Sequence, residues 1–150
     1  MLRVRDMSGE YCPLPSRGTG SDADAIQRML GAGRIAIVGL SDDPSRPSYE
    51  IATYLLGQGY AVVPVNPNHA AVLGMKCYPS LKDVPGEIDV VNVFRRSEFC
   101  ADVTRDAIAA GAKGVWLQSG IRNEDARRLA TAAGIDFVQD RCILVEHRMR

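Results

Sequence analysis

The sequence predicts an α/β fold with a doubly wound, mostly parallel sheet of five to six strands and helices on both faces. Short, continuous apolar runs such as 35–38 and 61–65 are typical of strands that are covered on both sides. These runs alternate with amphipathic segments of about 10–15 residues, which indicate helices. Because helical crossovers between strands are right-handed, this alternation favours parallel strands in one sheet.

Length and composition are those of an ordinary globular domain. The chain has 150 residues, which suits one domain with one core, and its 46% hydrophobic and 24% charged residues are an average balance. The 18 basic and 18 acidic residues give a formal net charge of zero. Since no overall field attracts polyanions, we expect neither nucleic acid nor a membrane as a partner, and any anion site must be local.

The cysteines are spread along the chain as Cys12, Cys77, Cys100 and Cys142, without a CxxC pair, and only two histidines occur. Because zinc ligands come at short, regular spacings, no structural metal site is expected. No apolar run is long enough to cross a bilayer, and the N-terminus has no signal-peptide core. We therefore expect a cytoplasmic protein with free thiols.

Residues 1–20 contain prolines, glycines and charges without apolar periodicity, so we expect a flexible N-terminal arm, followed by a single domain over 21–150. The domain is expected to begin with a helix that Ser21 caps and that ends near Gly31 or Gly33. Its apolar side chains are expected to pack beside the first strand, which makes its role structural.

The first strand, 35–38, leads into a helix over 47–58 that Pro47 opens, since proline is favoured at the first helical position. The glycines that follow are expected to end this helix. The second strand, 61–65, contains Pro64, whose missing N–H predicts a bulge or the end of the strand.

The second half of the chain continues the alternation. A turn is expected at 66–69, a short third strand within 72–78, a helical turn at 79–83 and a strand at 88–94. A helix that Ser97 caps and Gly111 ends should follow, and then a strand at 114–117. Glu124 and Asp125 should open the next helix, which buries Ala126, Leu129, Ala130 and Ala133; a short strand at 136–138 and a closing helix or turn at 141–148 complete the chain. With the strands numbered along the chain, the expected sheet order is 3-2-1-4-5.

In a sheet of this kind, ligands bind at the carboxyl ends of the strands, beside the point where the strand order reverses. Three segments are expected there, namely those that follow the first, second and fourth strands. The first of these combines Gly39 for close approach, Ser41 and Ser48 as hydroxyl donors, and Arg46 as a cation. It favours an anion such as a phosphate, or it is a plain turn in which Ser45 or Ser48 caps the helix and Arg46 is solvated.

The dinucleotide fingerprint is absent. A GxGxxG places glycines where the backbone meets the pyrophosphate, whereas Gly39 is followed by Leu40-Ser41-Asp42-Asp43-Pro44. The second strand is followed by Asn66 rather than by the acidic residue that binds the ribose of NAD, and no Gly-Lys-Ser/Thr of a P-loop occurs. A tightly bound NAD is therefore disfavoured.

Several motifs occur in a fixed order along the chain: Arg46-Pro47-Ser48-Tyr49, Pro64-Val65-Asn66-Pro67, Tyr78-Pro79-Ser80-Leu81, Trp116-Leu117-Gln118-Ser119-Gly120 and Asp140-Arg141-Cys142. Through them, the stretch from about Gly33 to Arg148 resembles the small bacterial CoA-binding proteins, which are stand-alone relatives of the N-terminal domain of the succinyl-CoA synthetase alpha subunit. The resemblance implies a Rossmann-like domain that binds coenzyme A at the carboxyl edge of the sheet.

The resemblance also implies roles for individual residues. The diphosphate of CoA would lie against Gly39, Ser41, Arg46 and Ser48, the adenosine half beside Asn66 and Pro67, and the nucleotide or pantetheine along Val93, Phe94 and Arg95. Arg95 and Arg96 would meet the 3′-phosphate or be surface charges near a helix start. Cys142, which resembles a family cysteine, would border the thiol end of CoA or be a small buried hydrophobe.

The sequence favours a non-catalytic carrier, sensor or regulatory module that binds CoA or an acyl-CoA. No nucleophile–base pair is visible, since His69 lies on a polar turn and His147 near the end of the chain, both without an evident partner. The alternatives are an enzyme that acts on an acyl-CoA thioester through Cys142 or a group near Gln118, a NAD- or nucleotide-binding domain, and a purely interaction domain. A protein partner or a homo-oligomer is compatible with each.

Overall fold

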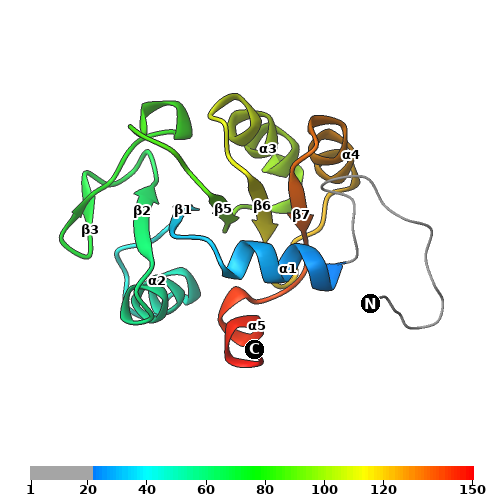
Figure 1. Ribbon diagram of the computed structural model, residues 1–150. Coiled ribbons are helices and arrows are strands. Elements are labelled where there is room, and N and C mark those ends of the chain that lie inside the picture. The colour runs from blue at the N-terminus through cyan, green and yellow to red at the C-terminus, as the bar shows by residue number, and fades with distance from the viewer. Residues whose placement is uncertain (1–21) are drawn as a thin grey trace.

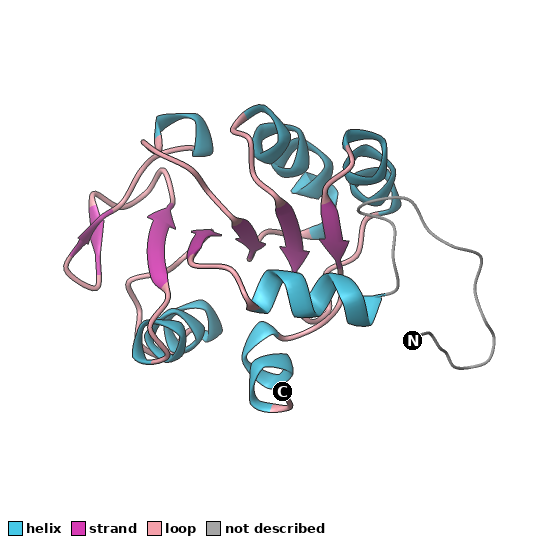
Figure 2. Cartoon of the chain, viewed as in Figure 1, coloured by secondary structure: helices cyan, strands magenta, loops and turns pink. Residues whose placement is uncertain are grey.

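A parallel sheet with helices on both faces forms the centre of the computed structural model, which describes residues 22–150 (Figures 1 and 2). Its strands, in spatial order, are β2 (Ala61–Val65), β1 (Arg34–Val38), β5 (Val90–Val93), β6 (Gly114–Leu117) and β7 (Asp136–Val138). All neighbouring pairs are parallel, so the fold is of the doubly wound, Rossmann-like α/β class that the sequence predicts. The arm expected over 1–20 lies outside the described residues.

The predicted third strand, 72–78, is not part of the main sheet. It folds into an antiparallel hairpin of β3 (Ala71–Val72) and β4 (Met75–Lys76). Leu73 and Gly74 both have a positive φ, 53° and 76°, and this conformation closes a two-residue turn instead of letting the chain run on. In the numbering of the expected strands, the sheet order is therefore 2-1-4-5-6 rather than 3-2-1-4-5.

β2 is an edge strand of this sheet, and Tyr78 forms a single parallel bridge with Val65 on its outer side. The pairing of β2 with β1 runs without interruption through Pro64, so the predicted bulge or strand end does not occur at this residue. The N–H of Tyr78 donates to the Pro64 carbonyl at 3.0 Å, which shows that Pro64 faces away from β1. Because its missing N–H lies on the outer edge, the ladder with β1 loses no hydrogen bond.

The helices are divided between the two faces of the sheet (Figure 1). One face is covered by α1 (Asp22–Leu30), α2 (Pro47–Gly57) and α5 (Ile143–Arg148). The other is covered by α3 (Cys100–Ala109) and α4 (Glu124–Ala133), together with the short 3-10 turns η1 (Leu81–Asp83) and η2 (Ser97–Phe99). Since strand side chains alternate between the faces, each face has its own apolar core.

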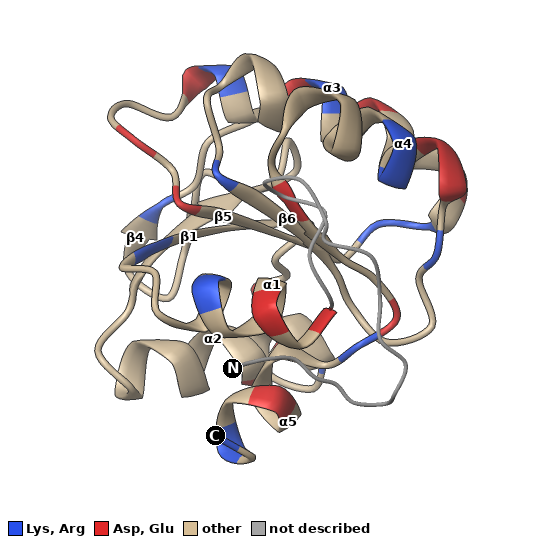
Figure 3. Ribbon diagram, turned by 45° about the vertical axis from the view of Figure 1, so that its right-hand side comes forward, with Lys and Arg blue, Asp and Glu red and all other residues tan. Residues whose placement is uncertain are grey.

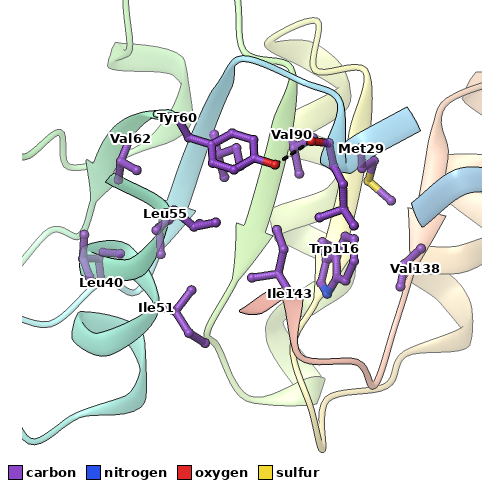
Figure 4. Packing of buried hydrophobic residues seen from close by; sticks show 14 of the residues in the cluster. Met29, Leu40, Ile51, Leu55, Tyr60, Val62, Val90, Trp116, Val138 and Ile143 are labelled. Atoms are coloured by element: carbon purple, nitrogen blue, oxygen red, sulfur yellow. Dashed lines mark hydrogen bonds between the residues drawn. The ribbon is translucent and has the colours of Figure 1, made fainter. Parts of the chain in front are cut away.

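The core on the α1, α2 and α5 face is built around a few large side chains (Figure 4). Trp116 is fully buried, and its indole N–H donates to the Arg141 carbonyl at 2.8 Å. The hydroxyl of Tyr60 donates to the Leu30 carbonyl at the end of α1 (Figure 4). Asn92 pairs with Trp116 across β5 and β6 and is also fully buried, yet its side-chain amide has no hydrogen-bond partner among the described residues.

The helix ends follow the sequence signals in part. α4 is capped by Asn123, whose side chain accepts the N–H of Ala126 at 2.8 Å, and it ends at Gly134 with a φ of 74°. Ser97 does not cap α3, contrary to the prediction, because the helix starts only after the η2 turn. The Ser97 hydroxyl instead accepts the N–H of Arg122 at 3.2 Å, which joins two loops at the carboxyl edge of the sheet.

Acidic and basic residues are interspersed along α3 and α4 (Figure 3). Asp102 and Arg105 form one such pair on α3 at 2.7 Å, and exposed pairs of this kind contribute at most about 1 kcal/mol. Ala133, which was expected to be buried, is exposed because the buried stripe of α4 ends one turn earlier, at Ala130.

No helix within residues 22–150 is long and apolar enough to span a bilayer, and the same residues hold no cluster of three potential metal ligands.

Candidate functional site

The carboxyl ends of β1, β2 and β5 surround a cavity of about 400 Å³. It lies beside the point where the strand order reverses, between β1 and β5, which is where open α/β sheets bind ligands. Its volume is in the range of small-molecule sites, roughly 300–1,000 Å³. The lining residues come from the strand ends, the turn after β2, η1 and α3, and they are Val38, Gly39, Val65, Asn66, Pro67, Asn68, Pro79, Ser80, Leu81, Phe94, Arg95, Val103 and Asp106.

The cavity has an apolar floor and a polar rim. Val38, Val65 and Leu81 belong to the core on the α3 face and form part of the floor. Asn68 and Asp106 are exposed residues of the lining and contribute polar groups. Such a surface suits a flat, largely apolar group with hydrogen-bonding edges, such as a nucleobase.

Gly39 lets the backbones after β1 and β5 meet at the cavity. The N–H of Phe94 donates to the Val38 carbonyl at 2.8 Å. Gly39 has a φ of 89°, and a Cβ at this position would lie 2.4 Å from the carbonyl oxygen of Phe94. Only glycine combines this φ with this approach without strain, so the residue fixes the shape of the chain where the strand order reverses.

The loop between β1 and α2 is organised by its own side chains. The hydroxyl of the buried Ser48 accepts the N–H of Ser41 at 3.0 Å, and the Ser41 hydroxyl accepts the N–H of Asp43 at 3.0 Å. The Asp43 carboxylate accepts the N–H and the hydroxyl of Ser45 at 2.9 and 2.8 Å, and these bonds lower the pKa of Asp43. Arg46 precedes α2 as its N-cap residue without a side-chain cap, so neither serine caps the helix. Its guanidinium is exposed, 3.9 Å from the Asp43 carboxylate.

The turn after β2 is tied to this loop. Asn66 donates from its side-chain amide to the Leu40 carbonyl at 3.1 Å and accepts the N–H of Asn68 at 2.9 Å. His69 is half-buried, with Nδ1 3.7 Å from a carboxylate oxygen of Asp42. The sequence did not reveal this partner of His69 because the two residues lie in different loops that only the fold brings together. The contacts hold the two loops side by side next to the cavity.

The third segment follows β5. Phe94 is half-buried and lines the cavity with Arg95, whereas Val93 is fully buried within the sheet. The guanidinium groups of Arg95 and Arg96 lie over the ring of Phe99, 4.8 and 5.6 Å from its centroid. Within residues 22–150, neither guanidinium has a carboxylate oxygen within 4 Å.

The cavity brings together part of the set of residues that the sequence singled out for CoA, namely Gly39, Asn66, Pro67, Phe94 and Arg95. The rest of the set lies in the adjoining loop, as Ser41, Arg46 and Ser48, or within the sheet, as Val93. The wall that η1 and α3 contribute was not named from the sequence; it includes Ser80, Leu81, Val103 and Asp106. Ser80 and Leu81 belong to a motif noted in the sequence, but no ligand contact was assigned to them, and Val103 and Asp106 form only part of a predicted helix.

The segment after β7 closes over the end of β6. Gln118 is buried, and its side-chain oxygen accepts the N–H of Ile143 at 3.0 Å. Cys142 is half-buried against the core at the start of α5. His147 has a partner that the sequence did not reveal, since its Nδ1 lies 2.7 Å from the Tyr54 hydroxyl. The described residues that line the cavity include neither histidine nor cysteine; the Ser80 hydroxyl donates to the Asp83 carboxylate at 2.8 Å.

Known proteins resemble this chain over most of its length. The CoA binding domain family matches residues 33–148. The uncharacterized protein YneT of Bacillus subtilis is 39% identical over 127 residues, which are 85% of this chain and 94% of that protein. A solved structure of a hypothetical protein from Pyrococcus horikoshii OT3 superposes with a TM-score of 0.81 at 38% identity, covering 93% of this chain and 97% of that chain.

A longer relative carries the same domain as one part. The ADP-forming acetate–CoA ligase II of Archaeoglobus fulgidus is 32% identical over 93 residues, which are 60% of this chain but 14% of the ligase. The likeness to the ligase therefore concerns a small portion of that protein. Since the family match covers most of the described residues, this chain belongs to the CoA-binding domain family.

Proposed function

We propose that this protein binds coenzyme A, or an acyl-CoA, at the carboxyl edge of its sheet, and that it acts as a non-catalytic carrier, sensor or regulatory module. The cavity beside the strand-order reversal, in a chain of the CoA-binding domain family, carries this proposal. The relative from Archaeoglobus fulgidus is named for a ligation to CoA, which supports the same ligand. Residues 21–150 would form the single binding domain.

The cavity would receive the adenosine half of CoA. The adenine would lie on the apolar floor, with Asn66 and Pro67 beside it and Phe94 along its edge. Asn66 already uses its side-chain oxygen and one of its two side-chain N–H groups within the protein, and these contacts fix its side chain beside the base. The Asp106 carboxylate, on the α3 wall, would accept a hydrogen bond from the exocyclic amine of the adenine. Val93 would support the floor from within the sheet.

The diphosphate would lie at the loop between β1 and α2. Arg46 would supply the charge, because its exposed side chain is only loosely paired with Asp43 and is free to turn toward a phosphate. The hydroxyls of Ser41 and Ser48 accept backbone N–H groups and so hold the loop, and each keeps its own hydrogen for donation. Gly39 would keep the centre of the site free of a side chain.

A binding role without catalysis agrees with the chemistry of the groups present. Burial raises the pKa of the Cys77 thiol, and it raises the pKa of Cys100 to about 11, so both are neutral thiols at pH 7. The cavity lining supplies no histidine that would act as a base. We therefore expect no release of CoA from acetyl-CoA or succinyl-CoA when either is incubated with the protein and free thiol is measured.

Isothermal titration with CoA, pantetheine and NAD tests the ligand. We expect CoA to bind and Arg46→Ala to weaken CoA about tenfold, because an exposed charged hydrogen bond is lost, while pantetheine, which has no diphosphate, is unaffected. Arg128→Ala is the matched control, since Arg128 is an equally exposed arginine on α4 that pairs with Asp125. Tight binding of NAD without binding of CoA contradicts the proposal, and steady release of CoA from a thioester contradicts its non-catalytic part.

A further inference from the structure

We infer that Arg95 and Arg96 form a second phosphate site, which recognises a phosphate monoester on the ribose of the bound nucleotide. This inference rests on the proposed binding of CoA and specifies it further, because CoA carries such a group at its 3′ position. The protein would thereby select the 3′-phosphorylated form over the same molecule without this phosphate.

The two arginines carry charge that the protein does not neutralise. Most of the exposed arginines on the described residues have a carboxylate partner, as Arg105 has Asp102 and Arg122 has Asp140. Arg95 and Arg96 have none within 4 Å in the same part of the chain, although they are adjacent in sequence. Two neighbouring like charges repel each other, so an anion bound between them would be stabilised.

The ring of Phe99 holds both guanidinium groups in place. They lie 4.8 and 5.6 Å from its centroid, a range in which the cation is attracted to the face of the ring. A guanidinium that contacts a ring in this way does not spend its N–H donors on the ring, so they stay available for a phosphate. Because the ring restricts the two side chains before a ligand arrives, less conformational entropy is lost on binding.

The backbone that carries these arginines is also fixed. The N–H of Phe99 donates to the Arg96 carbonyl at 2.9 Å, and the Cys100 thiol donates to the same carbonyl at 3.5 Å. Ser97 is held by the neighbouring loop, since its carbonyl accepts the side-chain N–H of Asn123 at 2.8 Å. The segment is thus a rigid support rather than a loose surface loop.

The position of the pair agrees with a phosphate on the ribose. Arg95 lines the cavity at the end of β5, whereas the loop proposed for the diphosphate follows β1, the neighbouring strand. A nucleotide with its base in the cavity and its diphosphate at the β1 loop has its ribose between these two strand ends. A phosphate on that ribose is then within reach of the long Arg95 side chain, with Arg96 beside it. Asp106 lines the same cavity, but no oxygen of its carboxylate lies within 4 Å of the Arg95 guanidinium, so Arg95 is not held in an ion pair with it.

Titration of the protein with CoA and with 3′-dephospho-CoA tests the inference. We expect the wild-type protein to bind CoA about tenfold or more tightly than dephospho-CoA, since charge-assisted contacts to one phosphate are lost. The double variant Arg95→Gln/Arg96→Gln should bind both compounds with the affinity that the wild type has for dephospho-CoA. Phe99→Leu should reduce the preference in part, because the arginines lose their platform, and Arg128→Ala should retain it in full.

The possible failures are separable. Equal affinities of the wild-type protein for the two compounds overturn the second phosphate site but leave CoA binding intact. A double variant that loses both compounds to the same degree assigns the arginines to the diphosphate and also overturns the inference. Failure of the wild-type protein to bind either compound overturns the proposed function itself. Thermal melting of each variant excludes loss of fold as the cause; it is expected within a few degrees of the wild type, because Arg96 is exposed and Arg95 is only half-buried.

Discussion

Replacement of Gly39 by alanine is expected to destabilise the protein by about 2–5 kcal/mol. The φ of 89° costs a residue with a Cβ about 1–2 kcal/mol. In addition, the new Cβ would lie 2.4 Å from the Phe94 carbonyl oxygen, so this separation must grow by at least 0.6 Å to reach the 3.0 Å limit of real contacts. The oxygen belongs to the backbone, and forcing packed backbone apart costs about 1–3 kcal/mol more.

Urea denaturation measures this loss, and Gly59→Ala is the matched control. Gly59 has a similar φ of 94°, but no atom lies within 4 Å of a Cβ placed there, so only the conformational cost of about 1–2 kcal/mol remains. The difference between the two variants isolates the contact with Phe94. If both variants lose the same stability, the close approach between the two strand ends is not a constraint and the reasoning is wrong. CoA affinity should also fall in Gly39→Ala and not in Gly59→Ala, because only Gly39 lines the cavity.

Two further predictions concern polar groups away from the cavity. Asn92→Leu should stabilise the protein by about 1–3 kcal/mol in the same denaturation assay, because it removes a fully buried amide without a partner; a loss of stability instead would mean that the amide is hydrogen-bonded. For Asp89, burial favours the neutral form, but hydrogen bonds from the N–H groups of Arg34 and Gly33, together with the nearby Lys113 ammonium, outweigh burial and lower the pKa. A lowered folded-state pKa gives stability that is present above the unfolded pKa of about 3.9 and is lost as the pH falls through the folded value. The wild-type protein should therefore lose more stability than Asp89→Asn between pH 5 and pH 2, as unfolding at a series of pH values would show, and parallel curves for the two proteins would contradict the assignment.

The parallel sheet was predictable because its strands are buried on both faces. Such strands need continuous apolar residues, and runs such as 35–38 contain little else. The hairpin over 71–76 was not predictable in the same way, since its apolar residues also fit a strand. The chain turns back into a hairpin because Leu73 has a positive φ, and a leucine in a sequence does not predict this conformation.

The site was predictable only where it consists of chain segments at the strand ends. Topology alone brings the residues after β1, β2 and β5 to one edge, and Gly39, Asn66 and Arg95 were identified in this way. The wall from α3 depends on how far that helix lies from the strand ends, which side-chain packing sets. The approach of His69 to Asp42 likewise depends on the shape of two loops, for which periodicity carries no information.

The two outer strands of the sheet bear on how the protein behaves at high concentration. An open strand edge is a template on which another chain can add a strand, and this is a common start of aggregation. At the β2 edge, Pro64 offers no N–H and Tyr78 occupies the Pro64 carbonyl. At the other edge β7 is three residues long, and its first residue, Asp136, is held by Arg28 of α1 at 2.7 Å. Both edges are therefore poor templates, and any self-association of the domain should proceed through its helices rather than by extension of the sheet.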